Sequence, residues 1–265
     1  IDYVAARVTE VFLADRRKWM EYGKREGIIT PGQEYEHITG VASGDPTPKT
    51  HSKLEQHPDF LETEIEFIID VSGSMAGEPL RKCREMLIII AEGFRKARMA
   101  LESEGLLDPR DEQPLRVGAV KFEANAVRIK KLKEPMTDHE EMKIIYELSR
   151  GGGGTDEKEA LEKVYGELTL RKENILKIMA ILTDGEGNKE AVQANMQQAE
   201  DDDEVVVAVM AIGSKAQSVI STYTAGLSRG EDSNIHAFEA EDPADILPQM
   251  LDFITDQVLE RRKFI

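Results

Sequence analysis

Residues 65–74 read Ile-Glu-Phe-Ile-Ile-Asp-Val-Ser-Gly-Ser. The first five are mostly apolar and β-branched, and a short run of this kind is typical of a strand buried inside a sheet. We expect the strand to end at Asp70, where a tight turn follows. This turn carries one carboxylate, on Asp70, and two hydroxyls, on Ser72 and Ser74. A core strand therefore leads directly into a loop of oxygen donors.

Downstream of this turn, the sequence predicts alternating helices and strands. Alternation of this kind indicates an α/β fold with a mostly parallel central sheet and helices on both faces, because parallel strands need crossover connections. The short connection between residues 120 and 126 predicts one antiparallel edge strand. The expected helices cover about 79–105, 138–148, 156–168, 189–200, 215–227 and a stretch after Asp242-Pro243, in which Pro248 marks either a kink or the true start. The expected strands cover 65–69, 115–120, 126–129, 175–182, 205–212 and 235–238.

The first 60 residues differ from the rest of the chain. Residues 2–26 have apolar side chains at helical spacing, which predicts one amphipathic N-terminal helix. Residues 27–60 are rich in glycine and proline and poor in apolar side chains, which indicates an extended linker. We therefore expect an N-terminal segment over 1–60 and one α/β domain over 61–265.

Composition limits the classes of partner. The chain has 265 residues and a formal charge of −17, which opposes binding to nucleic acid or to anionic lipid. No apolar run approaches the roughly 18 residues that a membrane span needs. Cys83 is the only cysteine, so no intramolecular disulfide can form, and we expect a cytoplasmic protein. Cys83 lies on the apolar stripe of its helix and is expected in the core.

Oxygen donors recur where parallel strands would end. Ligands of open α/β sheets bind at the carboxyl ends of the strands. Asp70, Ser72 and Ser74 lie at one such end, Asp184 follows the strand over 175–182, and Thr155 follows the tract Gly151–Gly154. These are hard oxygen donors, which Mg²⁺ prefers. The sequence therefore predicts one Mg²⁺ or Mn²⁺ site.

The pattern Asp-x-Ser-x-Ser, a loop threonine and a strand-end aspartate resembles the metal-ion-dependent adhesion site of von Willebrand factor A (vWA) domains. The resemblance covers about residues 61–262 and implies a Rossmann-like vWA fold. It implies that Asp70, Ser72, Ser74, Thr155 and Asp184 are the metal ligands, some of them through water. It also implies an open coordination position for an acidic group of a partner.

Finer details resemble the intracellular bacterial members of the family. Ser-Gly-Ser-Met followed by Gly77 and Pro79 is similar to chelatase subunits and to proteins that work beside AAA+ ATPases. We therefore expect a non-catalytic, metal-dependent module that binds a carboxylate of a protein partner, as an adaptor for an AAA+ ATPase. The alternative is a subunit of a metal-chelatase-like ATPase complex.

Other interpretations of these residues remain open or are disfavoured. Asp70 and Asp184 could merely end strands and cap helices, and Thr155 could be the N-cap of the helix after it. The glycine tract lacks the Gly-Lys-Ser/Thr of a phosphate-binding loop, because no glycine precedes Lys158. The five histidines show no zinc spacing, and the acidic runs lack calcium-loop glycines, so we expect both on the surface.

Enzymatic interpretations fit less well. A Mg²⁺-dependent phosphohydrolase of the haloacid-dehalogenase type would use Asp70 as the nucleophile, but it needs a second aspartate where this chain has Ser72. A serine hydrolase elbow would need glycine at position 70. We therefore do not expect an enzyme.

Overall fold

The computed structural model describes residues 6, 18–24, 28–29, 33–45, 47–56, 62–103, 115–170, 175–185, 187–202, 204–227 and 233–262. The chain divides into two compact units. One comprises Ile1–Val11 together with Leu61–Ile265, and the other comprises Phe12–Phe60.

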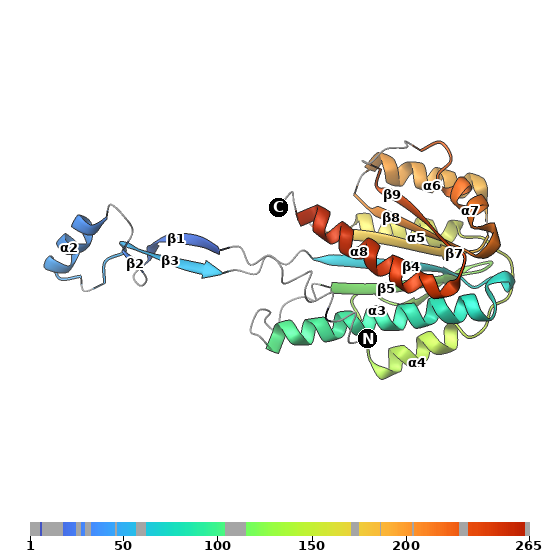
Figure 1. The fold of residues 1–265 in the computed structure, drawn as a ribbon, viewed down its shortest axis with the longest axis horizontal. Coiled ribbons are helices and arrows are strands. Elements are labelled where there is room, and N and C mark those ends of the chain that lie inside the picture. Colours follow the sequence, from blue (N-terminus) through green and yellow to red (C-terminus); the bar gives the residue numbers. More distant parts are fainter. Residues whose placement is uncertain are drawn as a thin grey trace. The chain divides into compact units, whose positions relative to one another are not determined.

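The larger unit is built on a six-stranded sheet with the order β6-β5-β4-β7-β8-β9 (Figure 1). All neighbouring strands are parallel except β5 and β6, which form the antiparallel edge pair. The predicted α/β fold, with a mostly parallel sheet and one antiparallel edge strand, is therefore confirmed. The strands are β4 (Thr63–Asp70), β5 (Leu115–Phe122), β6 (Ala126–Lys130), β7 (Leu176–Thr183), β8 (Val206–Ile212) and β9 (Ile235–Ala240).

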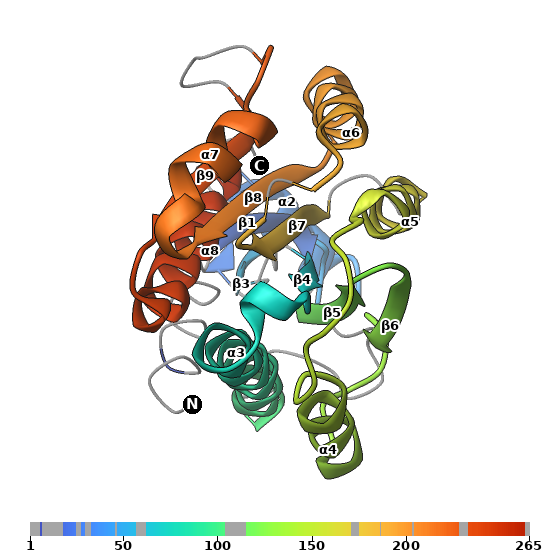
Figure 2. The ribbon, with the colours of Figure 1, turned by 90° about the vertical axis from the view of Figure 1, so that its right-hand side faces the viewer.

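Helices cover both faces of this sheet (Figure 2). One face carries α3 (Glu78–Ser103), α4 (Asp138–Glu147) and α8 (Ile246–Arg262). The other face carries α5 (Lys158–Thr169), α6 (Lys189–Asp202) and α7 (Ala216–Tyr223), whose apolar side chains form one cluster with the strands. Short 3₁₀ turns precede three of the helices: η1 (Gly73–Met75), η2 (Gly213–Lys215) and η3 (Pro243–Asp245).

The central strands are buried because helices lie on both of their faces. All eight residues of β4 and all eight of β7 are buried. Alternate side chains such as Ile68, Met179 and Ile181 join the cluster under α5, α6 and α7. Cys83 on α3 is fully buried, as expected for a core position, and Pro248 lies in the first turn of α8 and does not kink its middle. The carboxyl ends of β4 and β7 are therefore rigidly positioned side by side.

The prediction for the N-terminal segment is wrong in its described parts. Residues expected in the second half of a helix form the strand β1 (Lys18–Lys24). The expected linker contains β2 (Ile28–Ile29), α2 (Glu34–Ala42) and β3 (His51–Gln56). β3 pairs antiparallel with both β1 and β2. Except for residue 6, which is helical, the first half of the expected helix lies outside the described residues.

None of the described helices has the length and apolar content that crossing a membrane would require.

Candidate metal centre

The five predicted site residues come from three loops at one end of the sheet. Asp70 is the last residue of β4, and Ser72 and Ser74 lie in the turn that leads through η1 into α3. Asp184 directly follows β7, which pairs with β4 in the register Ile69↔Leu182. Thr155 lies in the loop between α4 and α5. Parallel pairing of β4 with β7 therefore brings residues more than a hundred positions apart in sequence to the same end of the sheet.

Hydroxyls connect the two strand ends. Ser72 Oγ and Ser74 Oγ are 3.1 Å apart, and Ser74 Oγ donates to Asp184 Oδ1 at 2.8 Å. Ser72 is buried, whereas Ser74 is exposed and Asp184 is partly exposed. One side of the group is closed by protein and the other is open to solvent. A ligand can therefore reach the carboxylate of Asp184 and the hydroxyl of Ser74.

Asp70 is the buried anchor of the group. Its Oδ1 accepts the backbone N–H of Ser72 at 2.8 Å, and its Oδ2 accepts the hydroxyl of Thr183 at 2.7 Å. Burial raises the pKa of Asp70 above its usual range, and the hydrogen bonds from Thr183 and Ser72 only partly oppose this rise. A cation beside Asp70 would offset the cost of burying its charge.

Thr155 reaches the same place from the glycine-rich loop. A Cβ at Gly185 would lie 3.7 Å from Thr155 Oγ1 and 3.8 Å from Asp70 Oδ2, so both oxygens border the space beside Gly185. Two backbone hydrogen bonds hold the loop: Gly152 N–H donates to Val71 O at 2.8 Å, and Asp156 N–H donates to Glu123 O at 2.7 Å. The structure thus gathers all five predicted residues around one small region.

The capping interpretations of Thr155 and Asp184 do not hold. The N-cap of α5 is Glu157, not Thr155. The start of α6 is capped by Asn188, whose Oδ1 accepts the backbone N–H of Ala191 at 3.2 Å. Neither Thr155 nor Asp184 therefore caps a helix.

Two residues of this region were missed in the sequence analysis. Thr183 fixes one carboxylate oxygen of Asp70, and its position directly before Asp184 at a strand end was the available signal.

Glu157 is buried, and its Oε2 accepts the backbone N–H of Asn188 at 3.4 Å. Gly187 has φ +53°, and any side chain there would collide with the Glu157 carboxylate. Burial raises the pKa of Glu157 to about 7. Glu157 thereby ties the loop after β7 to the loop that carries Thr155.

The donor set fits a hard divalent cation. Two carboxylates and three hydroxyls, all oxygen, suit Mg²⁺ or Mn²⁺, which take carboxylates and keep several water ligands. Among the described residues, no group of three or more His, Cys, Asp or Glu side chains is arranged for a metal ion. With only two carboxylates, the five residues leave room for ligands from water or from a partner.

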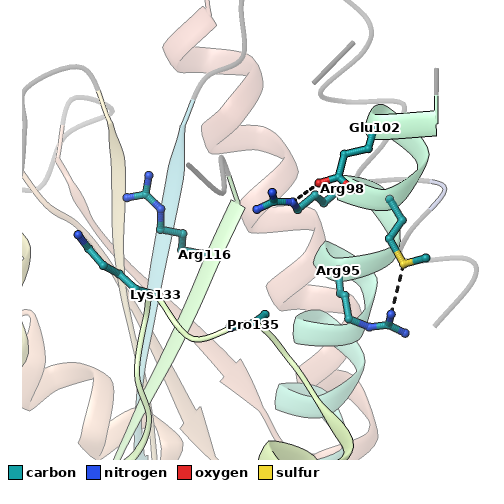
Figure 3. Close-up of a pocket in the computed structure, with 7 residues that line it drawn as sticks. Arg95, Arg98, Glu102, Arg116, Lys133 and Pro135 are labelled. Carbon is teal, nitrogen blue, oxygen red and sulfur yellow. Dashed lines mark hydrogen bonds and ion pairs between the residues drawn. The ribbon is translucent and has the colours of Figure 1, made fainter. Parts of the chain in front are cut away.

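A separate cavity lies at the opposite end of the sheet and has a different character (Figure 3). It measures about 510 Å³ and is lined by Arg95, Arg98, Met99, Glu102, Arg116, Lys133 and Pro135. Each arginine is ion-paired with glutamate, as Arg98 is with Glu102 at 2.5 Å. Because these pairs neutralise most of its positive charge, the cavity does not resemble an anion site.

The sequence also matches a known protein family. Residues 64–252 match the model of the von Willebrand factor type A domain. No curated protein matches the chain.

Similar solved structures share the fold at low sequence identity. Proximal thread matrix protein 1 from the mussel byssus, solved with a zinc-occupied MIDAS motif, is 17% identical with a TM-score of 0.51, over 73% of this chain and 45% of that one. The pilus adhesin SpaC from Lactobacillus rhamnosus GG is 14% identical with a TM-score of 0.55, over 79% of this chain and 32% of that one. The chain thus spans less than half the length of either, and at these identities the likeness shows the fold alone.

Proposed function

The chain belongs to the von Willebrand factor type A domain family, and on this premise we propose that it is a non-catalytic, metal-dependent protein-binding module. Asp70, Ser72, Ser74, Thr155 and Asp184 hold one divalent cation, directly or through water. The cation, when bound, supplies a positive charge that attracts a carboxylate of the partner. Without it, the two aspartates repel that carboxylate.

The observation that carries the proposal is the buried carboxylate of Asp70 beside an open group of hydroxyls. Asp70 is fully buried, its hydrogen bonds come from the uncharged groups of Ser72 and Thr183, and Ser74 and Asp184 are open to solvent. Burying a carboxylate is costly unless a cation or enough hydrogen bonds compensate for its lost hydration. A bound cation would compensate for the buried charge of Asp70 and, because Ser74 and Asp184 are open to solvent, could also be reached by a partner.

Mg²⁺ or Mn²⁺ is the proposed occupant, because the donors are all hard oxygens. The zinc-occupied MIDAS motif of the mussel protein supports a divalent cation without selecting Mg²⁺. Metal selectivity is therefore part of the test below.

The proposed type of partner and the proposed cellular location rest on the sequence alone. Ser-Gly-Ser-Met followed by Gly77 and Pro79 supports a role as an adaptor for an AAA+ ATPase, with a subunit of a chelatase-like ATPase complex as the alternative. A cytoplasmic location is proposed because Cys83 is the only cysteine. A Mg²⁺-dependent phosphohydrolase gains no support, since Ser72 occupies the position of the second aspartate.

Calorimetric titration with Mg²⁺, Mn²⁺ and Zn²⁺ tests the metal site. The parent chain is expected to bind one Mn²⁺, and Asp70→Ala and Asp184→Ala are expected to abolish binding because each removes a carboxylate ligand. Asp201→Ala is the matched control, since it removes an exposed carboxylate from α6. Equal uptake by the parent and by both site variants would rule out these ligands.

Partner binding is tested separately, with the chain immobilised and a captured AAA+ ATPase as the analyte. Binding is expected in excess Mg²⁺ and lost both in chelator and with Asp70→Ala. Thr155→Ala should weaken binding without abolishing it, because water can replace one neutral hydroxyl ligand. The same affinity in Mg²⁺, in chelator and with Asp70→Ala would show that the binding surface lies elsewhere.

A further inference from the structure

The β9 edge of the sheet has backbone groups that do not face β8. Among the described strands, β9 pairs only with β8. Val207 N–H donates to Asn234 O at 2.8 Å, which sets the direction of the ladder. In a parallel strand, successive residues point their backbone groups to opposite sides. Residues 236 and 238 therefore face β8, and Ile235, Ala237 and Glu239 direct their N–H and C=O groups outward.

Side chains cover the two ends of this outward row. Ser233 Oγ accepts the backbone N–H of Ile235 at 3.2 Å, and Gln249 Nε2 donates to Glu239 O at 3.2 Å. Ala237 lies between them, and no described residue bonds its outward N–H or C=O. The edge therefore offers one donor and one acceptor at Ala237, the pair to which an added strand would bond.

A cavity of about 360 Å³ adjoins this edge, between β9 and α8. The rings of His236 and Phe238 each lie 5.3 Å from the ring of Phe253 on α8, and these three rings form an aromatic wall. Burial lowers the pKa of His236, so the imidazole is neutral at pH 7 and adds no positive charge. Gln249 also lines the cavity, and its Oε1 is buried without a hydrogen-bond partner among the described residues. The cavity thus combines an apolar wall with a spare acceptor.

Acidic side chains line the α8 side of the cavity. Asp256 and Glu260 are exposed and lie four residues apart along the helix. Four helical residues rise about 6 Å, and two residues of an extended strand span roughly 6.6 Å. Of the described residues that line the cavity, none is Lys or Arg. The spacing of every second side chain on an extended peptide therefore nearly matches the spacing of these two carboxylates along α8.

We propose that β9 and α8 bind a short extended peptide of a protein partner in which every second residue is Lys or Arg. The peptide backbone bonds Ala237, two alternate basic side chains meet Asp256 and Glu260, and their aliphatic stems pack on Phe238 and Phe253. This site is distinct from the metal centre and does not depend on the proposed function.

Fluorescence anisotropy with a labelled acetyl-Val-Lys-Val-Lys-Val-Lys-amide peptide tests the proposal. The peptide is expected to bind and to weaken as salt rises, because exposed charge pairs are screened. The same peptide with Glu in place of Lys should not bind. N-methylation of its central residues should weaken binding by about fivefold, because it removes a backbone donor while the protein stays unchanged.

Two protein variants locate the peptide. Asp256→Asn with Glu260→Gln should weaken binding about fivefold, since two exposed ion pairs are lost. Ala237→Pro removes the outward N–H without breaking the β8 ladder and should weaken binding similarly, with circular dichroism to check its fold. The matched control is Glu190→Gln with Asp201→Asn, the same charge change on exposed positions of α6.

Chelator and Asp70→Ala are expected to leave peptide affinity unchanged, which separates this site from the metal centre. The proposal would be overturned if the Glu-containing peptide bound as tightly as the Lys-containing peptide. It would also be overturned if neither the Asp256→Asn with Glu260→Gln variant nor N-methylation of the peptide changed the affinity.

Discussion

The hydroxyl of Thr183 holds Asp70 although Thr183 is not among the proposed ligands. It donates to Asp70 Oδ2 at 2.7 Å, and the same hydroxyl oxygen accepts the backbone N–H of Gly185 at 3.1 Å. Groups that orient metal ligands typically contribute about 10- to 100-fold to metal affinity. At the scale of single residues, the site therefore extends past the five oxygens that would touch the cation.

We predict that Thr183→Val weakens Mn²⁺ binding by about tenfold, because Asp70 loses the hydrogen bond that fixes one of its oxygens. Calorimetric titration measures the change. Thr222→Val is the matched control, since Thr222 is buried and its hydroxyl donates to Ser218 O on α7. Parent affinity in Thr183→Val, or an equal loss in Thr222→Val, would contradict the prediction.

The gathering of the five predicted residues could be foreseen because their positions follow from simple rules. Asp70 and Asp184 each follow a largely apolar run, and this pattern predicts that a strand ends there. Glu157 could not be foreseen, because it looks like one of many charged residues at a helix start. Its burial depends on the path of the loop through Gly187, which no local pattern encodes.

At the scale of elements, an ion pair between Glu66 and Arg128 joins β4 to β6 across β5. Glu66 on β4 is buried, and Arg128 on β6 donates to both of its carboxylate oxygens at 2.7 and 2.6 Å. Gly118 lies directly opposite Glu66 in the β4–β5 register, and a Cβ there would collide with the Glu66 carboxylate. A glycine in the middle of a strand is thus required by the side chain of the neighbouring strand.

Gly118→Ala is predicted to lower the free energy of unfolding by about 1–3 kcal/mol, because the crowded Glu66 is held by Arg128 and cannot move freely. The control is Gly166→Ala in α5, where a Cβ would meet nothing within 4 Å. That substitution should stabilise by roughly 0.5 kcal/mol, since alanine favours helix. Urea denaturation measures both, and a neutral Gly118→Ala would contradict this account.

The buried carboxylate of Glu66 also predicts that the free energy of unfolding depends on pH. Burial raises the pKa of Glu66 from 4.5 to about 7, although Arg128 lowers it. Between these values the folded chain binds more protons at Glu66 than the unfolded chain does, so this group's contribution to stability falls as pH rises from 4.5 to 7. Glu66→Gln should remove up to about 3 kcal/mol of the fall.

Urea denaturation at pH 5 and pH 8 compares the parent with Glu66→Gln. Glu167→Gln is the control, because Glu167 bonds the same Arg128 but its side chain is 43% exposed. If Glu66→Gln and the parent lose the same stability between the two pH values, Glu66 does not titrate in this range.

The prediction of an N-terminal helix failed because the pairing of strands that are distant in sequence is not visible in the local pattern. The apolar residues of 2–26 fit a helical period, yet Lys18–Lys24 pairs with His51–Gln56, about thirty residues later. Trp19 and Tyr22 are residue types that favour strands. In the α/β unit, by contrast, the central strands β4, β7 and β8 contain largely apolar runs whose type can be assigned locally.

At the scale of the whole molecule, metal binding should stabilise the fold. A ligand that binds only the folded state at about 100 times its dissociation constant adds about 2.7 kcal/mol. We predict that Mg²⁺ at this excess raises the melting temperature by about 5–10 °C relative to chelator. Differential scanning calorimetry measures the shift, and Asp70→Ala should show none. A similar shift in that variant would mean that Mg²⁺ acts at another site.

The hydrogen bond from Thr183 to Asp70 joins residues 113 positions apart in sequence. During synthesis on the ribosome, Asp70 emerges first and must wait for the chain through β7 before its partner exists. The metal centre therefore cannot form before the chain has been made through β7 and Asp184. Uptake of the cation would then report that synthesis has passed β7 and that the central strands have paired.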